Sequence, residues 1–64
     1  MLPYQERVVQ QEQRELMQKI LSLSAFLNSE PLIDSEDLEL LREQLDSMHA
    51  YNHVLEQRIY RFKA

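Results

Sequence analysis

The sequence predicts an all-α protein, an antiparallel two-helix hairpin that self-associates into a helical bundle. The chain has 64 residues, no glycine and only two prolines, so little in it interrupts a helix. Apolar residues recur at steps of three and four along its second half, which is the spacing of one helix face. At 7.7 kDa the chain can form one small domain, residues 1–64, with too little interior to be stable as a lone hairpin.

The first helix is expected over about residues 3–27. Pro3 suits a first helical turn, where its missing N–H would have no partner, and the residues after it are mostly good helix formers. Asn28-Ser29-Glu30-Pro31 should end the helix, because Pro31 cannot continue the hydrogen-bond ladder and pushes Glu30 toward an extended backbone. Residues 28–34 then form the turn.

The second helix is expected over about residues 35–62. Asp34 and Ser35 offer capping oxygens, and Glu36 and Asp37 suit the positive end of the helix dipole. An unbroken heptad stripe follows, with a single polar member: Leu38, Leu41, Leu45, Met48, Asn52, Leu55, Ile59 and Phe62. The short connection indicates that the helices pack antiparallel.

Self-association is expected because nothing else in the sequence supplies a core. Chains this small usually need disulfides, a metal or a partner, and this one has no cysteine. Between Leu16 and Leu27 the first helix is apolar around much of its circumference, so it needs cover on more than one side. We therefore predict a homo-oligomer.

The charge distribution is uneven along the hairpin. Residues 15–50 hold two basic and eight acidic residues, whereas the two end segments together hold five basic and three acidic residues. In an antiparallel hairpin both end segments lie at one pole, so that pole is basic and the turn pole is acidic. The helix dipole favours part of this pattern by itself; a site for a small anion is the functional alternative.

The candidate ligand site lies at the basic pole. Its aromatic rings would stack a nucleobase, its guanidinium groups would hold phosphates and its amides would bind sugar or base edges. The residues assigned to these three roles are Tyr4, Tyr51 and Phe62, then Arg7, Arg58 and Arg61, then Gln11 and Asn52. In the alternative reading, the tyrosines pad the bundle and the arginines are solvated or pair with glutamates. Asn52 has its own alternative, which is to fix the register of the seam.

Several functions are excluded by what the sequence lacks. No serine sits in a nucleophile elbow and no carboxylate pair has contrasting environments, so we predict no catalytic residue and no enzyme. His49 and His53, with Asp46 and Glu56, have a metal-compatible spacing but face away from the seam, and we expect a solvated surface without metal or cofactor.

The negative net charge of −4 disfavours nucleic acid. The apolar run 20–27 is too short for a membrane span, and the start does not resemble a secretory signal, so a cytoplasmic protein is expected.

The chain resembles a family of small tailed-phage proteins related to a crAss-like phage gene product. The resemblance is carried by the opening Leu-Pro-Tyr-Gln-Glu-Arg-Val-Val and by Leu-Leu-Arg-Glu-Gln-Leu in the second half, and it extends over residues 2–62. Members are short helical hairpins encoded by accessory genes, without an enzyme motif. The resemblance implies action in the cytoplasm of an infected bacterial host. Small, oligomeric, helical accessory proteins of phages include sponges, which bind and hide nucleotide signals of bacterial immune systems. The resemblance therefore also implies an anti-defence sponge for a small anionic nucleotide signal, either a cyclic dinucleotide or an ADP-ribose derivative.

A second class of function stays open at this point. The chain can also be a helical interaction module that inhibits or bridges a host protein. Its contact surface would then be the apolar side with Met17, Leu21 and Phe26, or the acidic turn pole.

Overall fold

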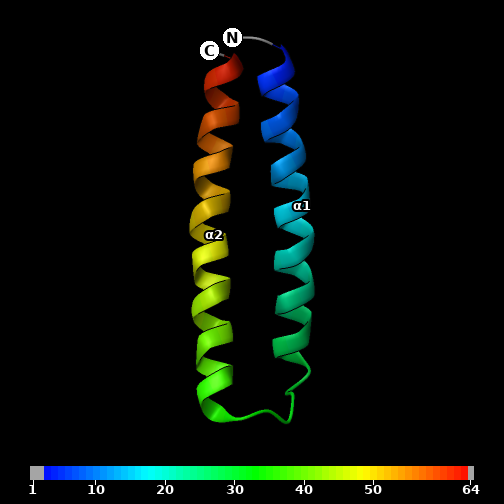
Figure 1. Ribbon diagram of the computed structural model, residues 1–64, viewed down its shortest axis with the longest axis vertical. Coiled ribbons are helices and arrows are strands. Elements are labelled where there is room, and N and C mark those ends of the chain that lie inside the picture. Colours follow the sequence, from blue (N-terminus) through cyan, green and yellow to red (C-terminus); the bar gives the residue numbers. More distant parts are fainter. Residues whose placement is uncertain (1–2, 64) are drawn as a thin grey trace.

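The computed structural model describes residues 3–63, which form two helices joined by a short turn. Helix α1 spans Pro3–Asn28 and helix α2 spans Ser35–Lys63. They lie antiparallel, with the first and last described residues at one end and the turn at the other (Figure 1). The predicted all-α hairpin is confirmed, since residues 3–63 contain these two helices and no strand. Each helix runs one residue beyond the expected range.

The heptad stripe of α2 faces α1, as predicted. Asn52 and Leu55 are buried, and the other six predicted positions are half-buried. Four of these six pack against the buried core, namely Leu45, Met48, Ile59 and Phe62. The period of three and four therefore identified the inward face of α2 correctly.

The inward stripe of α1 is less apolar than that of α2. It follows the same steps of three and four and contains Glu6, Val9, Gln13, Leu16, Ile20, Leu23 and Leu27, all buried or half-buried. Glu6 and Gln13 interrupt the apolar pattern, and other apolar side chains lie beside it. For these reasons, periodicity alone did not single out this stripe.

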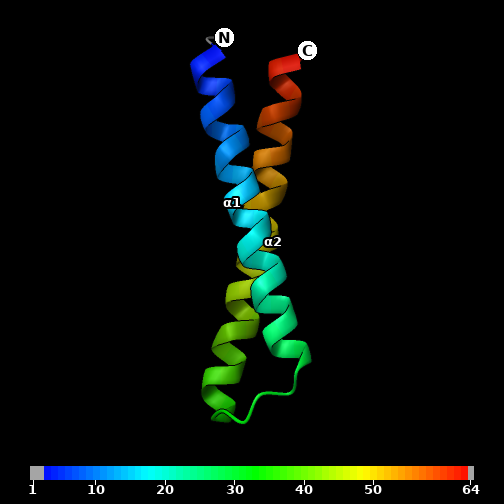
Figure 2. The same ribbon diagram turned by 90° about the vertical axis from the view of Figure 1, so that its right-hand side faces the viewer.

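The buried core is small. Among the described residues its apolar members are Val9, Leu16, Ile20 and Leu55, of which only Leu55 is fully enclosed. The hairpin is a rod with extents of 46 × 15 × 13 Å, and its two helices cross at a shallow angle (Figure 2). Such a shape gives each side chain only one neighbouring helix to pack against, so many large apolar side chains of the described residues stay exposed.

The turn closes on the carbonyl end of α1. Ser29 donates its backbone N–H to the Ala25 carbonyl at 3.1 Å and its Oγ–H to the Phe26 carbonyl at 2.6 Å. Glu30 adopts a left-handed conformation with φ of 53°, so the expectation of an extended Glu30 was wrong. Its N–H bonds the Leu27 carbonyl at 3.4 Å, and this closing bond is the usual reason for a left-handed residue after a helix.

The start of α2 and the charged poles agree with the sequence. The Asp34 carbonyl accepts the N–H of Leu38 at 2.9 Å, which places Asp34 at the cap. Glu36 and Asp37 occupy the first turn of α2, and Arg61 and Lys63 its last, as the helix dipole favours. The turn pole is therefore acidic, and the pole where α1 begins and α2 ends is basic.

Candidate functional site

A cavity opens between the helices at the basic pole. Its volume is about 510 Å³, and we call it the terminal cavity; it is lined by Tyr4, Gln5, Val8 and Val9 of α1 and by Arg58, Arg61 and Phe62 of α2. Sites for small organic ligands have volumes of about 300–1,000 Å³ and combine apolar walls with a few polar groups. The terminal cavity has both properties.

Helical spacing explains how these side chains meet. Val9 is buried and Phe62 half-buried in the seam, so they lie at the base of the cavity. Tyr4 and Val8 are one helical turn apart on α1, and Arg58 and Arg61 are one turn apart on α2. An aromatic and aliphatic wall on one helix therefore faces a cationic wall on the other.

The electrostatics of the terminal cavity favour an anion. Two guanidinium groups line it, and each can form a two-pronged hydrogen bond with a phosphate. Tyr4 and Gln5 belong to the first turn of α1, where backbone N–H groups have no acceptor within the helix and carry partial positive charge. A ligand with a flat ring and a phosphate matches this set of groups.

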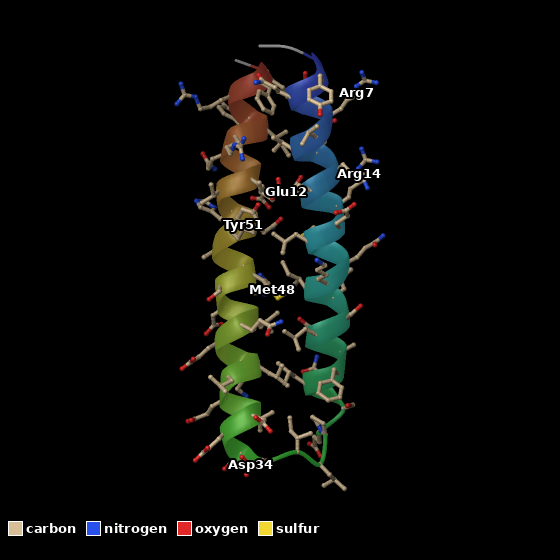
Figure 3. The ribbon with its side chains drawn as sticks, in the orientation of Figure 1. Arg7, Glu12, Arg14, Asp34, Met48 and Tyr51 are labelled. Atoms are coloured by element: carbon tan, nitrogen blue, oxygen red, sulfur yellow. The ribbon has the colours of Figure 1, made fainter. Side chains whose placement is uncertain are left out.

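A second hollow lies on α1 alone. We call it the outer groove, of about 690 Å³; it is lined by Tyr4, Arg7, Val8, Gln11, Glu12, Arg14 and Glu15. Arg7 and Arg14 point away from α2 (Figure 3). The Gln11 amide donates to the Glu15 carboxylate at 3.1 Å. Two carboxylates offset its two guanidinium groups, so this groove is less suited to an anion than the terminal cavity.

The predicted site residues therefore divide into three groups. The terminal cavity brings together Tyr4, Arg58, Arg61 and Phe62. Tyr4 also reaches the outer groove, with Arg7 and Gln11. Tyr51 and Asn52 line neither hollow; Tyr51 lies near the middle of the rod, on the side of α2 toward the viewer (Figure 3).

Asn52 is a buried member of the seam, with 9% of its surface exposed. Its Nδ2 donates to the Glu56 carboxylate at 3.1 Å, whereas its Oδ1 has no hydrogen-bond partner within the described chain. A buried amide with one free acceptor lowers stability. This placement favours the register role over a place in the terminal cavity.

His49 and His53 are exposed on α2, and residues 3–63 contain no group of three potential metal ligands close enough to share an ion. Neither of the two described helices has a run that is both apolar and long enough to cross a bilayer.

Comparison with known proteins gives the family. The model of the Sequestin family matches residues 2–61. The chain belongs to the Sequestin family. It is also 45% identical over 65 residues to an uncharacterised 7.5 kDa protein in the denB–rIIB intergenic region of Enterobacteria phage T4, covering 98% of this chain and 100% of the T4 protein. No solved structure matches it.

The phage affiliation predicted from the sequence is thus confirmed at the level of a small phage protein. The relation to a crAss-like phage gene product stays a prediction. The family name suggests a sequestering protein, and neither it nor the description of the T4 relative names a catalytic activity.

Sequence reasoning missed three lining residues of this Sequestin-family chain: Gln5, Val8 and Val9. The available signal was the inward register of α1, since Leu16 and Ile20 extend back through Gln13 to Val9 in steps of four and three. That register places Val9 inward, and Gln5 and Val8 beside it, facing α2.

Proposed function

We propose that this Sequestin-family protein binds and sequesters a nucleotide immune signal, without catalysis, in pockets between protomers. The ligand is an ADP-ribose derivative or a cyclic dinucleotide, and the effect is to protect an infecting phage from a bacterial defence system. The protein acts in the cytoplasm of the infected host. The observation that supports this proposal is the terminal cavity, with aromatic rings and two arginines at one pole.

The chemistry of the cavity suits retention rather than turnover. Tyr4 and Phe62 offer ring faces, and Arg58 and Arg61 offer charged donors for phosphate oxygens. None of these groups is a general base or a nucleophile for phosphate chemistry at neutral pH. Affinity without turnover depends on a rigid, enclosed site, and a second protomer would supply the missing enclosure.

The family also supports a sequestering role. The name Sequestin indicates a sequestering protein, and the T4 relative is of phage origin and of similar size. A sequestering protein must be made in amounts comparable to its ligand, and a chain of 64 residues uses few residues for each binding site.

The test is a thermal-shift panel of cyclic dinucleotides and ADP-ribose derivatives, with adenosine and inorganic phosphate as partial ligands. At a ligand concentration of about 100 times Kd, binding adds about 2.7 kcal/mol, which corresponds to a Tm increase of roughly 11 to 22 °C for a domain of this size. The ligand should be recovered intact after release from the protein. The proposal fails if no member of the panel raises the Tm.

A matched pair of variants tests the site itself. Arg58→Ala removes a donor in the terminal cavity, and we expect about 10- to 100-fold weaker binding, because a hydrogen bond to a charged group contributes about 1.5–3 kcal/mol. Arg14→Ala changes the net charge equally but lies in the outer groove, and it should retain affinity within about threefold. Equal losses in the two variants would indicate a general charge effect and would argue against this site.

A further inference from the structure

We propose that a second copy of the chain covers the face on which the terminal cavity opens, with the two copies antiparallel. The turn end of each copy then lies over the terminal cavity of the other. This inference rests on the proposed function only in that copies of the chain associate. It adds which face of the hairpin the second copy covers and the direction in which the two copies pack.

The face is defined by the helix register. It contains the side chains next to the inward stripes on one side of the hairpin, among them Gln5, Val8, Glu12, Glu15, Lys19 and Phe26 of α1, and Asp37, Leu40, Tyr51, Val54, Arg58 and Arg61 of α2. We call it the cavity face, because the terminal cavity joins residues of both helices on this side. Figure 3 shows Glu12 and Tyr51 of this face at neighbouring levels in the upper half of the hairpin.

The cavity face carries more exposed large apolar side chains than the opposite side of the hairpin. Five of its side chains are large, apolar or aromatic, and exposed: Val8, Phe26, Leu40, Tyr51 and Val54. Among the described residues the opposite side of the hairpin has three such side chains, Met17, Leu21 and Tyr60, and it carries both histidines. A hairpin with only four buried apolar side chains among its described residues gains most by covering the more apolar side.

The apolar side chains lie at matching levels when two copies pack antiparallel. Val8 comes five residues after the start of α1, and Leu40 comes five residues after the start of α2 at the opposite end of the rod. At about 1.5 Å per residue each lies roughly 8 Å from its helix end. A twofold axis across the middle of the rod packs each helix against its own counterpart, so Leu40 of one copy comes to the level of Val8 of the other and faces Arg58 on α2.

The middle of the face fits the same axis. Tyr51 comes sixteen residues after Ser35, which is roughly 24 Å along α2 and close to the middle of a rod 46 Å long. The two copies of Tyr51 thus meet near the axis, where aromatic pairs contribute favourable contacts.

Charge selects the antiparallel direction. Arg58 and Arg61 stand at the terminal pole of the cavity face, whereas Asp37 lies at its turn pole. An antiparallel pair brings opposite charges together at both ends, and a parallel pair would superimpose like charges. At each end of the pair, Arg58 and Arg61 of one copy then lie near Asp37 of the other, and Glu12 of the same face lies farther toward the middle of α1.

The second copy completes the site. The partner's Leu40 and the partner's Phe26 close the open side of the terminal cavity with apolar surface. Each dimer then holds two equivalent enclosed cavities. The apolar lid excludes water from the arginines, which strengthens their attraction for phosphate.

The surface is tested by sedimentation of two matched leucine variants. Leu40 on the cavity face is 61% exposed and Leu21 on the opposite side is 64% exposed, so an aspartate at either position leaves the buried core of Val9, Leu16, Ile20 and Leu55 unchanged. Leu40→Asp should sediment as a monomer at concentrations where the unaltered chain sediments at a multiple of 7.7 kDa, and Leu21→Asp should behave like the unaltered chain. An unaltered chain that is monomeric, or dissociation by Leu21→Asp alone, would overturn the proposal.

The direction is tested by cross-linking, which the absence of cysteine makes simple. The variants Arg58→Cys and Leu40→Cys are mixed and treated with a short bis-maleimide, since these two positions of α2 face each other in the antiparallel pair. A strong heterodimer band supports antiparallel pairing. A strong band from Leu40→Cys alone indicates parallel pairing and overturns the proposal. Added NaCl should weaken the antiparallel dimer, because it screens attraction between opposite poles.

These measurements use no nucleotide, so they fail independently of the proposed function. A chain that pairs antiparallel but binds no member of the nucleotide panel would retain this interface and lose the sequestration role. A chain that binds nucleotides but cross-links in another pattern would retain the role and lose this interface.

Discussion

Asn52 is the polar side chain in the apolar stripe of α2, and its two ends have different environments. Its Nδ2 bonds Glu56 and its Oδ1 is buried without a partner in the described chain. The sequence showed that this position was exceptional, but it could not distinguish register control from ligand contact, because both require a buried amide. The structure places Asn52 outside both hollows, and that favours register control.

Asn52→Leu tests this interpretation. Removing the unpaired acceptor should raise the free energy of unfolding by about 1–3 kcal/mol, measured by urea denaturation, while sedimentation should show more than one oligomeric state. Gln57→Leu, at an exposed position, serves as the control and should stay within about 0.5 kcal/mol. A single unchanged oligomer in Asn52→Leu would contradict a register role.

Glu30 is a second exceptional residue, because it adopts a left-handed backbone in a chain that has no glycine. Sequence reasoning predicted a turn here correctly but not this conformation. Pro31 favours an extended Glu30, whereas the hydrogen bond from the Glu30 N–H to the Leu27 carbonyl favours the left-handed conformation.

We expect Glu30→Gly to stabilise the hairpin by about 1 kcal/mol, since glycine adopts this conformation without the steric cost paid by other residues. Thermal unfolding monitored by circular dichroism should show a higher Tm. Glu30→Ala, which retains a Cβ, should show no such gain. A Tm that falls in the glycine variant would mean that the Glu30 side chain contributes more than its backbone costs.

At the scale of the helices, α2 was predictable and α1 only partly so. All eight predicted inward positions of α2 are buried or half-buried, because one period of apolar residues runs through the whole helix. In α1 the inward stripe contains Glu6 and Gln13, while apolar residues such as Leu21 lie outside it. Because apolar residues lie both inside and outside the inward stripe of α1, a single sequence does not reveal which of them face α2.

Gln13→Leu should therefore improve the packing of α1. Gln13 is half-buried in the inward stripe, and leucine has a similar helix propensity, so the gain comes from apolar burial and is expected to be about 1 kcal/mol. Urea denaturation is the measurement. Gln18→Leu at an exposed position should change little, and equal gains in the two variants would contradict the assigned register.

At the scale of the whole molecule, the hairpin is a thin rod with opposite charges at its ends. The charged poles followed from the sequence, because an antiparallel hairpin must bring its two ends together. The terminal cavity did not, since it depends on which side of each helix faces the other near Val9 and Phe62. The position of the cavity depends on the registers of both helices, and the sequence pattern revealed only the register of α2.

The stability of the rod should depend on protein concentration. If folding is linked to dimerisation, a tenfold higher concentration should raise the Tm by about 5 °C, measured by circular dichroism in cells of different path length. Leu40→Asp should show a lower Tm that does not vary with concentration. A constant Tm for the unaltered chain would mean that the single hairpin is stable by itself.

The position of the two helix ends has a practical consequence for anyone preparing this protein. Pro3 and Lys63 lie at the same end of the molecule as Tyr4 and Phe62 of the cavity (Figure 1). An affinity tag or fluorescent fusion on either terminus would crowd the entrance and compete with whatever enters it. A label inserted in the exposed connection near Leu32, at the far end of the rod, avoids that obstruction.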